Sequence, residues 1–129
     1  MKKSGKKSMK YRKRMTEMPE KGYDRYTVQM TQPAKRDLAE ITRYIARNNP
    51  QTALKITDRI EAKINALDHF PERGAYIPQL LEENIKEYRQ IIESPWKIIY
   101  KIDDEIVRIL AIIDSRRNLK DILIEKLLK

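Results

Sequence analysis

The chain has 129 residues, the length of a single domain with a modest core, and it contains no cysteine. A disulfide framework, a thiolate metal site and a cysteine nucleophile are therefore excluded. Its net charge is +9, while 3 glycines and 7% aromatic residues argue against a glycine-rich nucleotide loop or a large base-stacking platform. The N-terminus lacks the apolar segment of a signal peptide, and no apolar run is long enough to cross a bilayer. We therefore expect a soluble, cytoplasmic protein with no membrane partner.

Residues 1–22 hold most of the net charge. They carry nine lysines or arginines against two glutamates, a net of +7, which leaves +2 for residues 23–129. Because this segment can bury little, we predict a disordered extension over 1–22 and a single domain over 23–129. Two interpretations of the extension stay open. It is either an arm that contacts polyanions, or an extension that only increases solubility or is not translated, with the true start at Met9, Met15 or Met18.

A strand and two helices are predicted first along the chain. In RYTVQMT, Tyr26, Val28 and Met30 alternate with polar residues, which indicates a half-buried strand. The following segments repeat apolar residues at helical steps, and Asn49 with Pro50 suits the cap and first turn of the second helix. Helices joined so closely fold back as an αα-hairpin. The apolar stripes are Ala34, Leu38, Ile41 and Ile45 in the first helix, and Ala53, Ile56, Ile60, Ile64 and Leu67 in the second.

The second half of the chain reads as a loop, three strands and a helix. Pro71, Gly74 and Pro78 break the helical period in DHFPERGAYIPQL, so residues 68–80 are predicted to be a loop. IKEYRQIIE, WKIIYKI and EIVRILAII follow with turns short enough for an antiparallel meander. NLKDILIEKLLK returns to helical spacing, with Asn118 as its cap. The order β-α-α-β-β-β-α predicts an α+β fold, a four-stranded antiparallel sheet packed against the αα-hairpin, with the C-terminal helix at its edge.

This order of elements carries a resemblance. Together with YTVQMTQPAKRDLAEITRYIARNNPQTA, LDHFPERGAYIPQL, EYRQI, WKIIYKI and IIDSRRNLKDIL, it resembles the RelE/ParE superfamily of toxins from type II toxin–antitoxin systems, over about residues 24–128. The resemblance implies a small cytoplasmic toxin of the plasmid-stabilisation type, held inactive by a cognate antitoxin. RelE-like members cut messenger RNA in the ribosome, whereas ParE-like members poison DNA gyrase.

The candidate functional residues are cations on the strands or just after them, which can pair with phosphate or carboxylate. They are Arg89, Lys97, Arg108, Arg116 and Arg117, and we expect them on the face of the sheet opposite the helical hairpin. Neighbours in an extended segment point to opposite faces, so Arg116 and Arg117 cannot both serve one surface unless the turn reorients one. Either one of this pair is held by Asp114 or Glu93 while the other is solvated, or one guanidinium faces a polyanion or an antitoxin carboxylate. By resemblance, arginines at this position recur in the superfamily, especially among ParE-like members.

Cleavage of RNA also requires a base and an acid, and here the sequence is poor. The ribonucleolytic relatives place a tyrosine or histidine in the last strand or turn, where this chain offers only NLKDILIEKLLK. Tyr88 and Tyr100 are the remaining candidate proton carriers, although strand tyrosines commonly pack in a core, and His69 fits loop packing better than catalysis. Glu82 and Glu83 lack the further ligands that a metal needs, so we expect neither metal nor cofactor.

These observations favour a ParE-like gyrase inhibitor. A metal-independent mRNA endoribonuclease of the RelE type is one alternative, and a non-toxic or decayed binding module is another.

Overall fold

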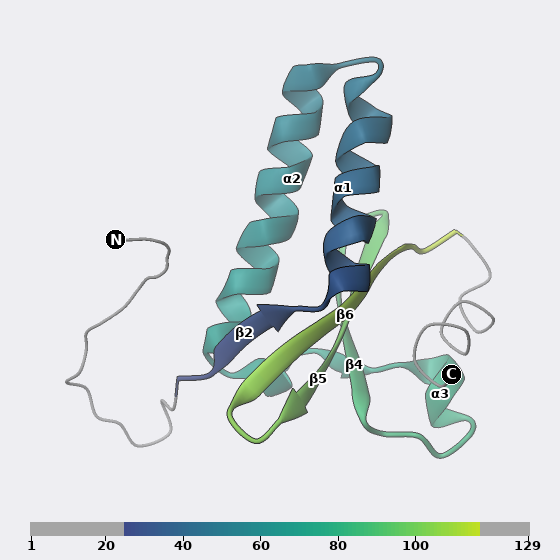
Figure 1. Cartoon of the computed structure of the whole chain (residues 1–129). Helices are drawn as coiled ribbons and strands as arrows, with labels where there is room; N and C mark the ends of the chain where they lie inside the picture. The colour runs from purple at the N-terminus through teal and green to yellow at the C-terminus, as the bar shows by residue number, and fades with distance from the viewer. Residues whose placement is uncertain (1–24, 117–129) are drawn as a thin grey trace.

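The structure is a computed structural model and describes residues 25–116. Figure 1 shows a sheet with a long helical hairpin rising from one side and the short helix α3 on the other. The predicted α+β class is therefore confirmed, whereas the N-terminal extension and the C-terminal helix lie outside the described residues. The elements are β2 (Thr27–Met30), α1 (Gln32–Ala46), α2 (Pro50–Asn65), the 3₁₀ turns η1 (Ala66–Asp68) and η2 (Pro71–Arg73), β3 (Ala75–Tyr76), α3 (Pro78–Leu81), β4 (Tyr88–Glu93), β5 (Trp96–Asp103) and β6 (Ile106–Asp114).

Both helices of the hairpin begin at side-chain caps. The Thr31 hydroxyl accepts a hydrogen bond from the Ala34 amide at 3.3 Å, and Asn49 Oδ1 accepts one from the Thr52 amide at 3.0 Å, as its sequence position predicts. Between the helices, the hydroxyls of Thr42 and Thr57 lie 2.6 Å apart and satisfy each other in the partly buried seam. The cap of α2 is thus local, whereas the Thr31 hydroxyl that caps α1 also donates to the Ile109 carbonyl oxygen of β6 at 3.0 Å, which ties the start of α1 to the sheet.

The sheet differs from the prediction in strand number and in the direction of its first strand. It has five strands in the order β2-β6-β5-β4-β3, and β2 runs parallel to β6 while the other neighbours are antiparallel. The predicted meander is present as β4, β5 and β6. The predicted fully antiparallel, four-stranded sheet is wrong because alternation fixes which face of a strand is buried, but not its neighbour or direction. The fifth strand, β3, forms within the predicted loop where two residues pair with β4.

Each face of the sheet buries a separate apolar cluster. On the hairpin side, residues from α1 and α2 pack on Ile98, Tyr100, Val107, Ile109 and Ile112. On the opposite side, Ile77 and Leu80 from the α3 region pack with residues of β4, β5 and β6. A bulge in β6 changes which residues of this strand face each cluster. Ile99 pairs with Ala111 and Tyr100 with Ile109, so that Leu110 is extra and the alternation shifts by one residue.

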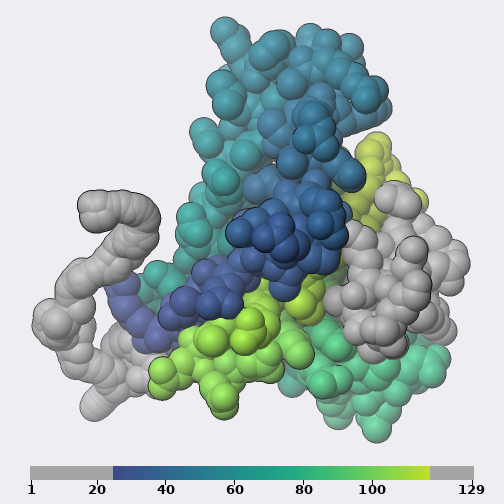
Figure 2. All heavy atoms as spheres, in the orientation of Figure 1, coloured from purple at the N-terminus to yellow at the C-terminus, as the bar shows by residue number. Residues whose placement is uncertain are grey.

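The hairpin covers only part of the sheet and then projects beyond it. Figure 2 shows the end of the hairpin standing clear of the rest of the described chain. The base is anchored to β6, where the Asp37 carboxylate accepts a hydrogen bond from the Ile112 amide at 3.0 Å. This bond satisfies a strand amide beyond the end of β2, on the edge that β2 leaves unpaired. Over residues 25–116, no helix has the length and hydropathy of a membrane span.

Candidate functional site

The five candidate cations do not gather on one surface. Cross-strand partners share a face of the sheet, and Arg89 pairs with Tyr100, which faces the hairpin. Lys97 pairs with Ile113, and Arg108 with Lys101, on the opposite face. The expected placement is therefore wrong for Arg89 and correct for Lys97 and Arg108. Arg116 follows the end of β6, and Arg117 lies outside the described residues.

Arg89 holds the segment that crosses from the hairpin to the sheet. Its Nη1 donates hydrogen bonds to the carbonyl oxygens of Glu72 at 3.0 Å and Gly74 at 2.8 Å. Its Nη2 donates to the Tyr76 hydroxyl at 3.3 Å, and the guanidinium lies 4.4 Å from the centre of the Tyr76 ring. Three donors and the flat face of the guanidinium are thus already used within the chain, which is the pattern of a structural arginine.

Tyr100 completes this arrangement from the core. Its side chain is fully buried, and its hydroxyl donates to the Pro71 carbonyl oxygen at 2.5 Å while accepting from the Gly74 amide at 3.0 Å. Burial raises the pKa of the Tyr100 phenol above its ordinary value, against the opposing effects of the Gly74 hydrogen bond and nearby arginines. A phenol that is buried, doubly hydrogen-bonded and harder to ionise is poorly suited to carry protons for a substrate. Tyr88 is also buried, in the core of the opposite face.

The cations on the open face share one carboxylate. Arg108 Nε lies 3.1 Å from Asp103 Oδ2, and Lys101 Nζ lies 3.6 Å from the same oxygen. Arg108 also donates to Gln29 Oε1 at 3.1 Å, which joins β2 to β6 through side chains. Lys97 is half-buried between Ile92 and Ile113 on the neighbouring strands. This row is partly neutralised by Asp103, so it is a weak binding surface for a polyanion.

Arg116 is held by Asp114, one of the two partners anticipated for the arginine pair. Arg116 Nε donates to Asp114 Oδ1 at 2.9 Å, and Nη2 bonds Oδ2 at 2.5 Å. The hydrogen bond and charge of Asp114 raise the pKa of Arg116 above its ordinary value. The side chain is nevertheless 74% exposed. The fork therefore orients the guanidinium while leaving its outer edge open to solvent.

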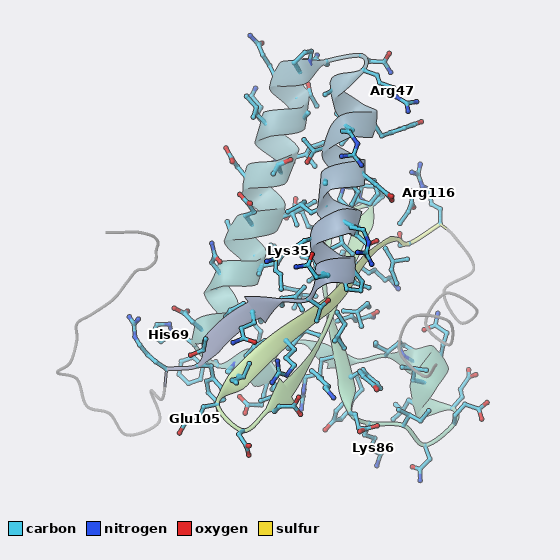
Figure 3. All side chains as sticks on the ribbon, in the orientation of Figure 1. Lys35, Arg47, His69, Lys86, Glu105 and Arg116 are labelled. Carbon is cyan, nitrogen blue, oxygen red and sulfur yellow. The ribbon has the colours of Figure 1, made fainter. Side chains whose placement is uncertain are left out.

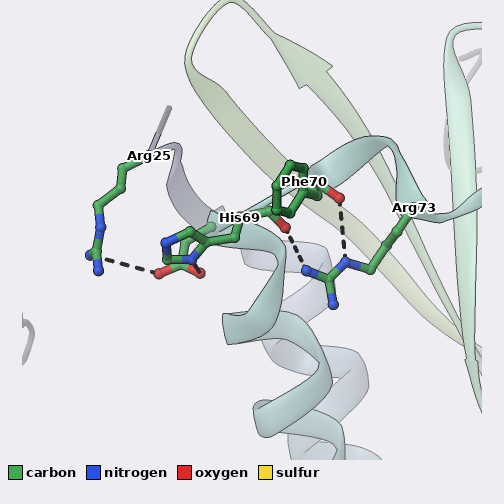
Figure 4. A network of polar contacts seen from close by, with 5 residues as sticks. Arg25, His69, Phe70 and Arg73 are labelled. Atoms are coloured by element: carbon green, nitrogen blue, oxygen red, sulfur yellow. Dashed lines mark hydrogen bonds and ion pairs between the residues drawn. The ribbon is translucent and has the colours of Figure 1, made fainter. Parts of the chain in front are cut away.

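His69 belongs to a polar network at the base of α2, shown in Figure 4. Its Nδ1 lies 2.8 Å from Asp68 Oδ1, and Arg25 Nη1 lies 4.0 Å from the other oxygen of that carboxylate. Arg73 donates to the carbonyl oxygens of His69 at 2.6 Å and Phe70 at 3.3 Å. The network links the loop to the start of the first strand, consistent with loop packing. Among the described residues, no three histidine or acidic side chains could hold a metal ion together.

Sequence reasoning missed the side chains at the closed end of the hairpin. Tyr44 and Leu54 are the two most exposed large apolar side chains, at 66% and 64%. Each falls outside the apolar stripe of its helix, and that mismatch with the helical period was the available signal. Arg47 lies over the ring of Tyr44, 5.9 Å from its centre.

Comparison with known proteins identifies the family. Residues 28–119 match the family described as "ParE toxin of type II toxin-antitoxin system, parDE". This chain belongs to the ParE toxin family. It is 32% identical over 90 residues to Toxin ParE3 of Caulobacter vibrioides, a match that covers 69% of this chain and 86% of that protein.

Two solved structures are similar to this ParE-family toxin. The chromosomal ParDE toxin–antitoxin system from P. aeruginosa contains a chain with a TM-score of 0.58 and 22% identity, covering 70% of this chain and 97% of that one. At that identity the match shows the fold. A chain of the RelBE2 toxin–antitoxin complex from Mycobacterium tuberculosis has a TM-score of 0.48 and 25% identity, covering 70% of this chain and 91% of its own length.

Proposed function

We propose that this toxin arrests growth by inhibiting DNA gyrase through protein–protein contact. The observation that supports this choice over RNA cleavage is the state of the two strand tyrosines. Tyr88 is 7% exposed and Tyr100 is 0% exposed, with the Tyr100 hydroxyl bound to two backbone groups. A general base must reach the proton that it removes, and neither of these phenols can reach a substrate on the surface.

The proposal includes a cognate antitoxin as partner and the cytoplasm as the site of action. Its support is membership of a toxin family from type II toxin–antitoxin systems and the fold shared with the P. aeruginosa ParDE system. Contact of the N-terminal extension with polyanions stays a prediction, since residues 1–22 lie outside the described part of the chain.

One observation favours RelE-like cleavage of messenger RNA as the second candidate. Tyr76 is 39% exposed, and its hydroxyl accepts a hydrogen bond from Arg89. A surface phenol beside a guanidinium joins a proton carrier to a phosphate-binding group, which a metal-independent ribonuclease needs. Against this, the Arg89 guanidinium is already bound to two backbone carbonyls.

The deciding experiment is inducible expression of the chain with and without the neighbouring gene, with separate readouts of DNA breaks and of message integrity. We expect growth arrest only without the neighbouring gene, with DNA breaks and intact message. Ribosome-dependent cuts in message without DNA breaks would instead support the RelE-like function. Normal growth would support the non-toxic binding module.

A further inference from the structure

The closed end of the α1–α2 hairpin is basic and uncovered. We call residues 43–55 the hairpin tip. This segment contains Arg43, Arg47 and Lys55, all exposed, and no aspartate or glutamate. The nearest acidic residues along the two helices are Glu40 and Asp58, which lie toward the sheet. The tip therefore presents positive charge at the part of the molecule that projects furthest from the sheet (Figure 2).

Among the described residues, the three tip cations have no carboxylate partner, in contrast to several cations on or beside the sheet. Within residues 25–116, Arg59 pairs with Glu93, Arg108 with Asp103 and Arg116 with Asp114. Over the same residues, no carboxylate pairs with the three tip cations. Among the residues that the structure describes, the one side-chain interaction of these cations is the contact of Arg47 with the Tyr44 ring. The charge of the tip is available to a partner.

The tip also exposes apolar surface that the fold does not use. Leu54 is exposed although its neighbour Ala53 is buried. Tyr44 is likewise exposed, although Ile41, one helical turn earlier, is buried. Single exposed apolar residues are common, but here two of them lie on one projecting end among cations that have no carboxylate partner. Removing Leu54 and the Tyr44 ring from water would stabilise a complex with a protein partner.

Arg116 adds a fourth cation beside this surface. Figure 3 shows Arg47 and Arg116 on the same side of the hairpin. Asp114 fixes the direction of the Arg116 guanidinium, which lowers the entropy lost on binding.

We propose that the hairpin tip, extended by Arg116, is the surface that contacts the target protein, and that it fits an acidic protein surface that also offers apolar contacts. The inference rests on the proposed function, in which that protein is gyrase. Arginine and tyrosine are the residue types most enriched in protein-binding hot spots, and cations without acidic neighbours complement an acidic partner. Exposed Leu54 favours a protein over DNA, because phosphate backbone binding gains little from an aliphatic side chain.

The test measures binding of the full chain to each purified gyrase subunit without DNA. One variant, Arg43→Gln with Arg47→Gln, removes two charges from the tip. Its matched control, Lys35→Gln with Lys63→Gln, removes two charges from exposed positions of the same helices near the sheet. A second variant, Tyr44→Ala with Leu54→Ala, removes the apolar part of the tip, and Leu81→Ala, which alters an exposed leucine of α3, is its control. Circular dichroism checks that each variant is folded.

We expect both tip variants to weaken binding about tenfold or more, and both controls to change it less than about twofold. Equal losses in the charge variant and its control would overturn the tip assignment, because net charge alone would then explain binding. Unchanged binding by the tip variants would overturn it too, while leaving gyrase as the target. Binding that appears only when DNA is added would assign the tip to DNA instead. No binding by the unaltered chain would overturn the proposed function and this inference together.

Discussion

The segment around Gly74 and the hairpin tip each place arginine beside tyrosine, yet they use these residues in opposite ways. At Gly74, Arg89 donates to backbone carbonyl oxygens and Tyr100 is buried with its hydroxyl doubly bonded. At the tip, the Arg47 guanidinium lies over the exposed ring of Tyr44 and has no other side-chain partner in the described part of the chain. The same residue types stabilise the fold in one place and are free to bind in the other.

This difference teaches that the role of an arginine, structural or binding, depends on the groups around it and not on its position on a strand. A buried carbonyl oxygen without a hydrogen bond destabilises the fold, and a nearby guanidinium stabilises it by donating that bond. At the closed end of the hairpin, the Arg47 amide donates to carbonyl oxygens within α1 and the Asn49 side chain caps α2, so these caps use no cationic side chain. The cations at the tip are therefore not needed as hydrogen-bond donors to the backbone. The predictions below test this contrast.

The largest expected effect is at Gly74. A Cβ atom added there would lie 2.3 Å from the Tyr100 hydroxyl and 2.8 Å from the Gln90 carbonyl oxygen. Gly74→Ala should therefore lower the free energy of unfolding by about 3 kcal/mol, because the buried hydroxyl and the strand backbone cannot both move away. Urea denaturation measures this. Ala75→Gly, at the next, exposed residue, should cost about 1 kcal/mol or less, and equal losses in the two variants would contradict the close packing at Gly74.

Tyr100→Phe should have the next largest effect. It leaves the Pro71 carbonyl oxygen and the Gly74 amide without their partner, at a cost of about 2 kcal/mol in the free energy of unfolding. Tyr44→Phe, which removes a hydroxyl at an exposed position, is the matched control and should change it by less than about 0.5 kcal/mol. A loss shared by both variants would show that the buried hydroxyl has no special role.

The same phenol predicts a dependence of stability on pH. Because burial raises the pKa of Tyr100 in the folded state above the ordinary value of 10.0, the unfolded chain loses this proton first as the pH rises. The contribution of the protonated phenol to the free energy of unfolding is thus complete below the pKa of the unfolded chain. It is lost as the pH rises through the folded-state pKa. The free energy of unfolding, measured from neutral to alkaline pH, should fall more steeply with pH for the unaltered chain than for Tyr100→Phe. An equal dependence on pH in the two proteins would contradict the raised pKa.

Arg89→Ala should cost less, about 1 kcal/mol, because the guanidinium is only half-buried and water can replace part of its hydrogen bonding. Thermal unfolding detects this loss. Lys97→Ala removes the same charge from the opposite face, where no hydrogen bond to the backbone is broken, and should change the free energy of unfolding by less than about 0.5 kcal/mol. If Lys97→Ala were the more harmful variant, the structural assignment of Arg89 would be wrong.

Arg116→Ala should have the smallest effect on the fold. Its side chain is exposed and its one side-chain partner within residues 25–116 is Asp114, two residues away, so the melting temperature should not change measurably. Inhibition of gyrase should nevertheless weaken about threefold to tenfold, because a guanidinium at the edge of the tip is lost. Measured together, an intact melting temperature and full inhibition would remove Arg116 from the contact surface.

The elements with local signals were predictable from the sequence. Asn49 and Pro50 mark the start of α2, and the alternation of Tyr26, Val28 and Met30 predicts the face that packs on the hairpin-side core. What could not be predicted depends on residues distant in the chain. The parallel pairing of β2 with β6 and the bond from Asp37 to the Ile112 amide, 75 residues away, leave no local pattern.

The candidate site shows the same limit more sharply. Arg89 was correctly placed on a strand but on the wrong face of the sheet, since its side follows from pairing with Tyr100. Of the alternatives left open for the arginine pair, an ion pair with Asp114 is present at Arg116, two residues further along the chain. The tip was not predicted because its cations lie on helices and not on strands, although Tyr44 and Leu54 interrupt the polar faces of those helices.

The measurement that tests the account most directly is a gyrase assay with purified full-length chain, relaxed plasmid and ATP. The account predicts that supercoiling is inhibited and that cleaved DNA accumulates, while a parallel ribosome assay leaves messenger RNA intact. Normal supercoiling with no cleaved DNA, at concentrations of the chain that arrest growth, would contradict it.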